Sequence, residues 1–333
     1  MAGETELGLR GSPALFNTSN RRFYPASTRF YLMIAPAHLP PATGPGDRVG
    51  VAALSGPIDP ERLEQGMAAL AALGFTPVAA DNLASRHGLF AGSDGERLAA
   101  FHRLAADPDI RAIFFARGGH GLLRVLPGID WELLARRPRA YIGYSDLTPF
   151  LHAVVARLQL VAFHGPLVAA EIARGLSAQE RDSLFGALAG RYPAAEPLAA
   201  PVRAGAASGP LLGGCLSLLA ATQGTPFAPD LSGSLLFWED VGETPYRIDR
   251  MLTHLRLSGT LSGITGMIVG HISLGGFDGD ADWPALVGDA LSGFPWPLAW
   301  GLPSGHAAPN RTLPLGLGAR LGADATQLWL GEG

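Results

Sequence analysis

The chain has 333 residues, of which 47% are hydrophobic and 16% are charged, so it can bury the core of one large domain or two ordinary ones and is not an intrinsically disordered protein. Its formal net charge of −4 gives no basic surface for nucleic acid or an anionic membrane, and no apolar run reaches the roughly 18 residues that predict a spanning helix. One cysteine excludes an internal disulfide and a cysteine-rich zinc module.

All 25 basic residues are arginine, because the sequence contains no lysine. This excludes the enzyme classes that depend on a lysine side chain: P-loop nucleotide hydrolases, Schiff-base enzymes and penicillin-binding-type enzymes with an S-x-x-K nucleophile. Any strong, fork-like contact to a substrate carboxylate must therefore come from arginine.

The first 44 residues differ from the rest of the chain. They contain isolated arginines and aromatic residues, followed by a proline-rich run at 36–45. Arg21 and Arg22 resemble a twin-arginine export signal, but the apolar stretch after them, residues 30–35, is shorter than the ~7–15 residues that an export signal needs. We expect residues 1–44 to be a disordered extension outside the fold, with Met33 as an alternative start of the protein.

Strands and helices are predicted to alternate between residues 45 and 190. The expected apolar strands are residues 49–54, 75–79 and 112–116, and a strand that ends at 141–143. One expected helix is capped by Asp59, which is followed by a proline suited to the first helical position. Two further helices are expected at about 95–106 and 147–158. This alternation predicts an α/β domain with a parallel sheet and helices on both faces.

A segment rich in proline, alanine and glycine, residues 191–209, predicts a linker between two domains. The pattern after it is less regular, so residues 210–333 predict a smaller, mixed α/β domain. The expected elements are a helix from 215, a strand at 234–238, a helix at 246–257, a strand at 267–271, and short strands near 313 and at 327–330.

Two polar turns follow predicted strands of the first domain. The turn at 117–121, Arg-Gly-Gly-His-Gly, would let backbone N–H groups approach a ligand closely, as an oxyanion hole requires, although a tight turn alone also explains its glycines. Ser145 lies in Gly-Tyr-Ser-Asp, between a strand and a helix, where a sharp turn would expose a nucleophile. The alternative is that Ser145 or Asp146 only caps the following helix.

Two further polar clusters lie in the second half of the chain. The strand before residues 239–243 ends in three carboxylates that cannot all be buried without partners. A glycine- and proline-rich loop at 301–306 ends in His306. No HExxH motif, paired CxxC motif or clustered ligand spacing predicts a metal site.

In chain order, Ser145, Glu239 and His306 supply a nucleophile, an acid and a base, which together are sufficient for acyl transfer. Asp240 and Glu243 are the less favoured alternatives for the acid. We expect the backbone N–H groups of Gly119 and Asp146 to face the oxyanion, with Gly118 in the same turn against the substrate.

Arg117 is the candidate for binding a free substrate carboxylate, since it stands beside the predicted oxyanion hole. A structural ion pair under the turn is the alternative role for this arginine.

The ordered set of blocks resembles the serine-type LD-carboxypeptidase family, the muramoyl-tetrapeptide carboxypeptidases, which also contains the microcin C immunity hydrolases. The resemblance begins at Gly46 and runs almost to the C-terminus. The blocks that carry it are 117–121, 143–146, the His-Gly-Pro at 164–166, the Gly-Gly-Cys-Leu at 213–216, 239–240 with 246–252, and 305–306 with 313–316. The sequence departs from the family pattern at His120, where a tyrosine is common, and at Cys215, where an asparagine is frequent.

The resemblance implies a two-domain enzyme with Ser145 in the α/β domain and Glu239 and His306 in the smaller one. Its implied activity is release of the terminal D-alanine from the L,D-bond of murein tetrapeptides during cell-wall recycling. The resemblance also implies a cytoplasmic homodimer that uses neither a metal ion nor another cofactor.

Three other functions remain open at this point. A microcin-immunity-type hydrolase, or another amide hydrolase on the same scaffold, would keep the same three residues. An α/β-hydrolase esterase would need a better G-x-S-x-G turn, because Leu147 stands where the second glycine belongs. A non-catalytic ligand-binding protein would leave the three residues without a purpose.

Overall fold

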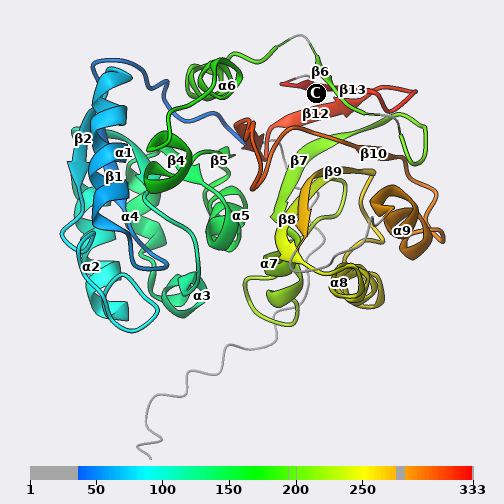
Figure 1. Ribbon diagram of the computed structural model, residues 1–333, viewed down its shortest axis with the longest axis horizontal. Coiled ribbons are helices and arrows are strands. Elements are labelled where there is room, and N and C mark those ends of the chain that lie inside the picture. Colours follow the sequence, from blue (N-terminus) through cyan, green and yellow to red (C-terminus); the bar gives the residue numbers. More distant parts are fainter. Residues whose placement is uncertain (1–36, 194, 200, 275–281, 332–333) are drawn as a thin grey trace, which may run out of the picture. The chain divides into compact units, whose positions relative to one another are not determined.

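The computed structural model describes residues 37–193, 195–199, 201–274 and 282–331, and the strands of this part of the chain form two sheets (Figure 1). Helices accompany both sheets, so the α/β class predicted from the sequence is confirmed. Within the described ranges, no helix is both long enough and apolar enough to cross a bilayer.

The first sheet has six strands. In spatial order they are β11 (Leu313–Leu315), β5 (Ala162–His164), β4 (Ala140–Gly143), β3 (Ile110–Phe115), β1 (Arg48–Ala52) and β2 (Thr76–Ala79). Strands β1 to β5 pair in parallel, as the alternating pattern predicts. The residues of β1, β3, β4 and β5 are almost all buried because helices cover both faces of the sheet, whereas the edge strand β2 is partly exposed.

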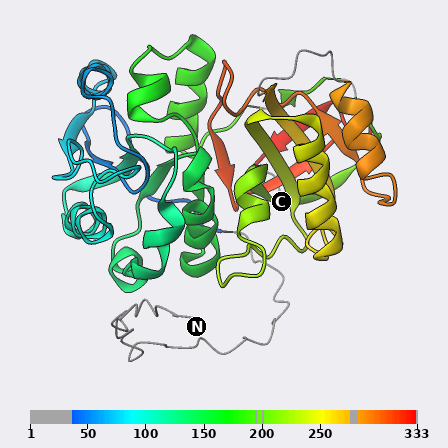
Figure 2. The same ribbon diagram turned by 60° about the horizontal axis from the view of Figure 1, so that its bottom comes forward.

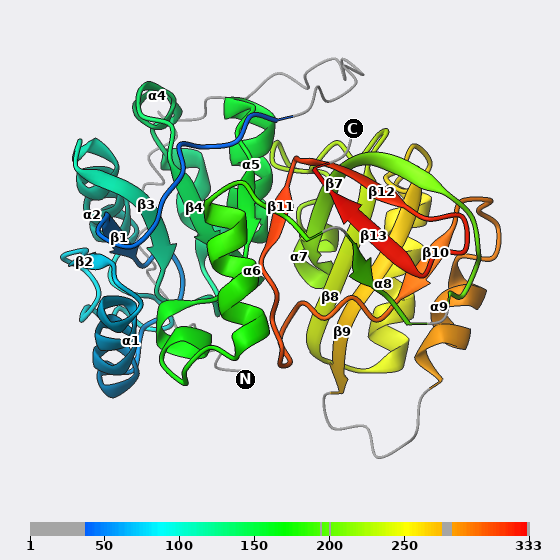
Figure 3. The same cartoon turned by 90° about the horizontal axis from the view of Figure 1, so that it is seen from above.

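The helices of this half lie on the two sides of the sheet. They are α1 (Pro60–Ala72), α2 (Asp94–Ala106), α3 (Leu122–Val125), α4 (Trp131–Arg136), α5 (Thr148–Leu158) and α6 (Ala178–Leu188), with short turns η1 (Leu126–Gly128), η2 (Ser145–Leu147) and η3 (Val168–Ile172). Figure 3 shows α1 and α6 on one side and α4 and α5 on the other. The predicted start of α1 is confirmed, since the Asp59 side chain accepts a hydrogen bond from the backbone N–H of Arg62 at 3.0 Å.

The second sheet has seven strands. In spatial order they are β10 (Leu298–Trp300), β9 (Gly266–Leu274), β8 (Leu235–Glu243), β7 (Ala207–Cys215), β12 (Gly318–Leu321), β13 (Gln327–Leu330) and β6 (Glu196–Pro197). The first four pair in parallel and the last three antiparallel, so the sheet is mixed, as expected. The helices α7 (Leu216–Ala221), α8 (Pro245–Leu257) and α9 (Trp283–Ala290) accompany it, and Figure 2 shows α7 and α8 (yellow-green and yellow) on one face.

Strand β11 differs from the sequence-based expectation, because it comes from the C-terminal part of the chain but belongs to the first sheet. It pairs antiparallel with β5, with Leu313 opposite His164. Both faces of this three-residue strand are buried, and its pattern alone does not specify which sheet it joins. The segment that carries His306 is therefore anchored to the sheet that carries Ser145.

The segment expected as a linker, residues 191–209, contains part of the second sheet. Within it β6 pairs with β13, and the last three residues already belong to β7. The Glu196 side chain is buried and forms an ion pair with Arg311 at 2.5 Å. A proline- and alanine-rich composition hides such a short edge strand from periodicity analysis.

Residues 37–44, which the sequence assigns to the extension, pack against the fold. The backbone N–H of Ala37 donates to Gly316, and that of Thr43 donates to Leu188. His38 forms an isolated β-bridge with Leu160, two residues before β5. The side chains of Ala37 and Thr43 are buried. The remainder of the expected extension, residues 1–36, lies outside the described residues.

Two truncations test this packing. Removing residues 2–44 is expected to cost at least about 2 kcal/mol of the free energy of unfolding, because it removes several backbone hydrogen bonds and two buried side chains. This loss should lower Tm by several degrees. Removing residues 2–36 keeps all these contacts and should leave Tm within about 1 °C. Thermal unfolding followed by circular dichroism compares the two, and equal Tm values for both truncations would contradict the assignment.

Candidate active site

Ser145 stands on a strained turn between β4 and α5. The strand ends at Gly143, Tyr144 is extended, and Ser145 itself has φ +64°, in the left-handed region that residues other than glycine rarely adopt. Neither Ser145 nor Asp146 caps the following helix with its side chain in the described structure, so the capping alternative does not apply there. The turn instead places the half-buried Ser145 at the carboxyl ends of the parallel strands.

The glycine turn after β3 lies directly against Ser145. A Cβ atom on Gly118 would stand 2.9 Å from the Ser145 Cβ, 3.1 Å from its Oγ and 3.4 Å from the backbone nitrogen of Asp146. Gly119 has φ +96°, which also favours glycine. The backbone of this turn therefore lies close to the Ser145 side chain, where a side chain at Gly118 would not fit.

The side chain of Asp146 binds the chain directly after the same glycine turn. Its Oδ2 accepts a hydrogen bond from the backbone N–H of Leu122 at 2.8 Å, at the start of α3. Asp146 is 3% exposed, so this bond replaces its contact with water. The carboxylate therefore positions the end of the turn.

His306 and Glu239 complete a hydrogen-bonded series with Ser145. The His306 Nε2 lies 3.0 Å from the Ser145 Oγ, and its Nδ1 lies 2.7 Å from the Glu239 Oε2. The same carboxylate oxygen accepts the backbone N–H of His306 at 3.2 Å. The structure thus brings together three side chains that lie on the turn η2 after β4, on β8 and on the loop after β10.

Gly305 allows the histidine loop to pass over the carboxylate. Its φ is +124°, and a Cβ there would come within 2.7 Å of the Glu239 Oε2. A side chain at this position would push the loop away from Glu239.

The environment shifts the pKa values of both partners upward. Burial raises the pKa of the Glu239 carboxyl, which is fully buried, although the hydrogen bond and the charge of His306 oppose this. Burial lowers the pKa of His306, but the hydrogen bond and charge of Glu239 outweigh it, with smaller contributions from Asp240 and Glu171, so its pKa lies above the usual value. The carboxylate therefore stabilises a protonated imidazole.

The two alternative acids have other partners. The carboxylate of Asp240 accepts the backbone N–H groups of Ser217 at 2.7 Å and Val241 at 2.8 Å. Glu243 forms an ion pair with Arg247 at 2.7 Å. Glu239 is thus the one of these three acids that the structure places on His306.

Tyr144 forms an aromatic wall beside the histidine, a role that the sequence analysis missed. Its ring centroid lies 4.7 Å from that of His306 and 5.2 Å from that of His164. Its hydroxyl donates to Glu171 at 2.7 Å, which fixes the ring. The tyrosine precedes Ser145 in the Gly-Tyr-Ser-Asp block at 143–146. No local pattern predicts its contact with Glu171, which is 27 residues away.

His164, from the His-Gly-Pro block, is fully buried behind Tyr144. Neither ring nitrogen has a hydrogen-bond partner among the described residues. Burial lowers the pKa of His164 to about 3, so the ring is neutral at pH 7 and cannot compete with His306 for a proton.

Arg117 does not contact the other candidate residues through an ion pair in the described part of the chain. Its guanidinium donates a hydrogen bond to the backbone carbonyl of Pro57, and the side chain is exposed. The side chain lies beside the glycine turn, since its Nε would lie 3.8 Å from a Cβ on Gly119. Among the described residues, the Pro57 carbonyl takes the place of the ion pair that was the alternative role for Arg117.

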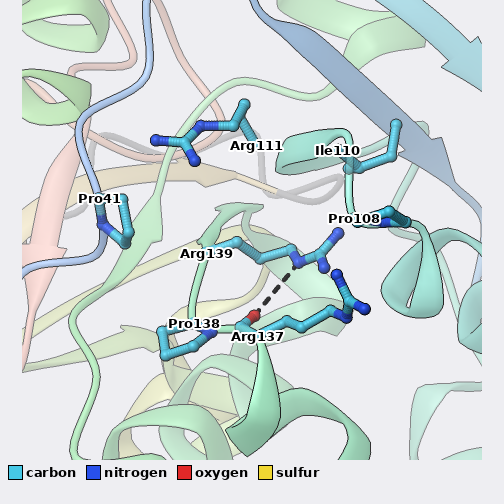
Figure 4. A pocket seen from close by; sticks show the side chains of 7 residues that line it. All are labelled: Pro41, Pro108, Ile110, Arg111, Arg137, Pro138 and Arg139. Atoms are coloured by element: carbon cyan, nitrogen blue, oxygen red, sulfur yellow. Dashed lines mark hydrogen bonds between the residues drawn. The ribbon is translucent and has the colours of Figure 1, made fainter.

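A cavity of about 150 Å³ lies at the amino ends of the strands of the first sheet, opposite the ends that lead to Ser145 (Figure 4). Its lining residues are Pro41, Pro108, Ile110, Arg111, Arg137, Pro138 and Arg139. The buried Arg139 donates to the carbonyls of Leu104, Ala105, Asp107 and Arg137, so its guanidinium already serves the end of α2. This cavity is therefore separate from the series at Ser145. Over the described ranges, no group of three or more His, Cys, Asp or Glu residues could hold a metal ion.

Two family models match the chain. The LD-carboxypeptidase N-terminal domain matches residues 49–165, which include Ser145. The LD-carboxypeptidase C-terminal domain matches residues 208–321, which include Glu239 and His306.

Similar proteins match 70–90% of the chain. A Streptomyces coelicolor protein with a carboxypeptidase name is 39% identical over 306 residues, which are 90% of this chain and 96% of that protein. The murein tetrapeptide carboxypeptidase of Pseudomonas aeruginosa is 36% identical over 253 residues, covering 70% of this chain and 79% of its own. A solved muramoyltetrapeptide carboxypeptidase from Oxalobacter formigenes has a TM-score of 0.76 and 31% identity, and the match covers 85% of this chain and 97% of that one.

The fold is also similar to that of the microcin C7 self-immunity protein MccF of Escherichia coli, with a TM-score of 0.80 and 23% identity over 89% of this chain and 99% of that one. This likeness concerns the fold. From the two family matches and the relatives above 30% identity, the chain belongs to the LD-carboxypeptidase family, as its motifs predict.

Proposed function

We propose that the chain is a serine L,D-carboxypeptidase that releases the terminal D-alanine of murein tetrapeptides, without a metal ion, in the cytoplasm and as a homodimer. The observation that carries the proposal is the hydrogen-bonded series from Glu239 through His306 to Ser145, beside a glycine turn. The substrate class is supported by the names of the relatives from Pseudomonas aeruginosa and Oxalobacter formigenes. Metal independence, compartment and oligomeric state rest on the family resemblance.

In this mechanism His306 activates the serine. The hydroxyl of Ser145 is a poor nucleophile at neutral pH, so its proton passes to the His306 Nε2 as the Oγ bonds to the carbonyl carbon of the L,D-peptide bond. Glu239 accepts the Nδ1–H, which orients the ring and stabilises the imidazolium that forms. Because the pKa of His306 is raised by this carboxylate, the base is strong but becomes protonated at a higher pH than an ordinary histidine.

The negative charge on the carbonyl oxygen is assigned to backbone N–H groups of Gly119 and Asp146. The closeness of the Gly118 backbone to Ser145 supports this assignment. The imidazolium then donates its proton to the amine of the leaving D-alanine, and the C–N bond breaks to give an acyl-serine. Water, deprotonated by His306, hydrolyses the ester and releases the tripeptide.

Release of free D-alanine from a purified murein tetrapeptide tests this proposal. We expect stoichiometric D-alanine and tripeptide, with no cleavage of a diastereomer that ends in L-alanine, because the acyl-enzyme forms only at a correctly placed L,D-bond. Activity should persist after dialysis against a chelator. Loss of activity on chelation, restored by one divalent ion, would overturn the metal-free mechanism, and an inert tetrapeptide would overturn the substrate assignment.

The alternative of a microcin-immunity-type amide hydrolase predicts a different substrate. MccF has been solved with aspartyl sulfamoyl adenosine and with glutamyl sulfamoyl guanosine, and its active-site variant replaces a serine, an asparagine and a lysine. This chain has no lysine, so it lacks one of those three residue types entirely. We therefore expect an aminoacyl sulfamoyl nucleoside to be cleaved far more slowly than the tetrapeptide in a direct comparison.

Arg117 is proposed to bind the terminal carboxylate of the substrate. Its exposed guanidinium is held beside the glycine turn by the Pro57 carbonyl, which leaves other N–H groups for a ligand. Replacing Arg117 with alanine should lower kcat/KM for the tetrapeptide roughly 10–100-fold, the usual weight of a charge-assisted hydrogen bond. Hydrolysis of the C-terminally amidated analogue should fall much less.

A matched control for this prediction is Arg111, an exposed arginine at the other edge of the same sheet. Its replacement with alanine should leave the hydrolysis of both the tetrapeptide and the amidated analogue unchanged. Equal losses on the free and amidated substrates in the Arg117 variant would show that this residue only supports the turn.

A further inference from the structure

The position of His306 is set by a loop that contains no strand or helix. This loop, residues 301–312, leads from β10 in the seven-stranded sheet to β11 in the six-stranded sheet. Glu239 holds the histidine from the side of the seven-stranded sheet. A base must stay within hydrogen-bond reach of its nucleophile, so contacts that hold the loop to the six-stranded sheet, which carries Ser145, bear on catalysis.

Asn310 closes the loop on itself behind the histidine. Its Oδ1 accepts a hydrogen bond from the backbone N–H of Gly305, the residue before His306, at 3.0 Å, and another from the Ser304 hydroxyl at 3.3 Å. Asn310 is 1% exposed, so water does not replace these bonds. The amide oxygen thereby fixes the backbone that carries His306.

Glu180 binds Asn310 from α6, a helix that packs on the six-stranded sheet. Its Oε1 accepts the backbone N–H of Asn310 at 2.9 Å, although the two residues are 130 positions apart. One turn further along α6, the Ser183 hydroxyl accepts the backbone N–H of Thr312 at 3.1 Å. Helix α6 therefore binds the histidine loop through two hydrogen bonds, at Asn310 and at Thr312.

The Glu180 carboxylate is fully buried and charged. Burial raises its pKa, but an ion pair with Arg174 and the N–H donors of Asn310 and Ser177 outweigh this and leave the pKa at about 2. The contact to Asn310 is therefore a charge-assisted hydrogen bond at neutral pH.

The start of α2 offers a comparison that isolates this role. Glu96 and Glu180 occupy the same position in two capping boxes, with Ser93 and Ser177 as the capping serines. Glu96 is exposed and its carboxylate accepts hydrogen bonds from Ser93, whereas Glu180 is buried and also binds Arg174 and Asn310. Helix capping accounts for Glu96, but it does not require the burial or the loop contact of Glu180.

We propose that Glu180 and Asn310 are positioning residues, which hold the His306 loop so that Nε2 stays within reach of Ser145. The proposal rests on the proposed function, because it assigns the purpose of this contact to catalysis. It requires that loosening either residue changes the state of His306 and not only the stability of the fold.

The experiment compares Asn310→Ala, Glu180→Gln and Glu96→Gln with the unmodified enzyme. The first removes the acceptor for Gly305, the second removes the buried charge but keeps the side-chain shape, and the third weakens a capping box alone. We measure Tm, kcat and KM for D-alanine release, and the pKa of His306 by NMR titration of its ring. The titration needs no substrate.

For Asn310→Ala and Glu180→Gln, we expect kcat to fall about tenfold or more with KM within about twofold, since the histidine spends less time in reach of the serine. The pKa of His306 should fall as well, because the ring is held less firmly on Glu239. Glu96→Gln should lower Tm but leave kcat and the pKa of His306 unchanged.

The proposal is overturned if Asn310→Ala and Glu180→Gln lower Tm as Glu96→Gln does but keep the wild-type kcat and His306 pKa. Glu180→Gln retains the size of the side chain, so it decides the matter if Asn310→Ala does not fold. If the unmodified enzyme releases no D-alanine, the proposed function fails, and the titration of His306 still decides whether these residues position it.

Discussion

Replacing Ser145 or His306 with alanine is expected to lower kcat for D-alanine release by roughly 10⁴–10⁶-fold. In the proposed mechanism the serine provides the atom that bonds to the substrate, and the His306 ring, 3.0 Å away in the described structure, takes its proton. In energy this corresponds to about 5–8 kcal/mol of transition-state stabilisation. KM should change little, because neither side chain is assigned to ground-state binding.

The double variant should be little worse than either single one, since the two side chains act as a unit. Ser208→Ala provides a matched control, because this exposed serine lies on β7 and takes no part in the series. Steady-state kinetics with a sensitive D-alanine assay measures all four proteins. Additive losses, or a Ser145→Ala enzyme that keeps a tenth of its activity, would contradict the assignment of the nucleophile.

Replacing Glu239 with glutamine should lower kcat roughly 10³–10⁴-fold. The carboxylate accepts both the ring Nδ1–H and the backbone N–H of His306. A glutamine amide keeps one neutral acceptor oxygen and can turn its NH2 toward the ring, so it no longer fixes the tautomer and the orientation of the ring. The buried imidazole also loses the charge that stabilises its protonated form.

The pH profile of the same variant tests this argument independently of the rate. Glu239 holds the pKa of His306 above its usual value of about 6.5, against the opposing effect of burial. Without the carboxylate, burial dominates and the pKa of His306 falls. The acid limb of kcat/KM, where protonation of the base abolishes activity, should therefore move to lower pH in Glu239→Gln.

Asp240→Asn is the control for the pH profile. Asp240 adjoins Glu239 in the chain, but its carboxylate binds the backbone N–H groups of Ser217 and Val241. We expect a smaller shift of the acid limb in the same direction and a loss of kcat below about tenfold. A Glu239→Gln enzyme with the wild-type acid limb would mean that another group titrates in that limb.

The sequence contains local signals for much of the fold and for the identity of the candidate residues. The parallel strands β1 to β5 follow from apolar runs separated by capped helices, such as the helix that begins after Asp59. Ser145 and Glu239 stand where such runs end, and the carboxyl ends of parallel strands are where α/β proteins carry their sites. These features depend on residues close together in the chain.

The contacts that complete the site depend on residues far apart in the chain, and local patterns do not contain them. Ser145 and His306 are 161 positions apart, and Glu180 and Asn310 are 130 apart. Strand β11 is too short and too fully buried for its pattern to specify the sheet that it joins. Glu180 itself fits a capping box, so its local motif conceals the long-range contact.

The central claim is that the Ser145 hydroxyl is the nucleophile for D-alanine release. It is tested most directly by titrating the enzyme with a fluorophosphonate, a reagent that phosphonylates activated serines. The labelled fraction of Ser145 is mapped by mass spectrometry, and the remaining rate of D-alanine release is measured on the same samples. We predict a straight line that reaches zero activity when Ser145 is fully labelled, whereas undiminished release at full labelling, or label on another serine with Ser145 free, would contradict the claim.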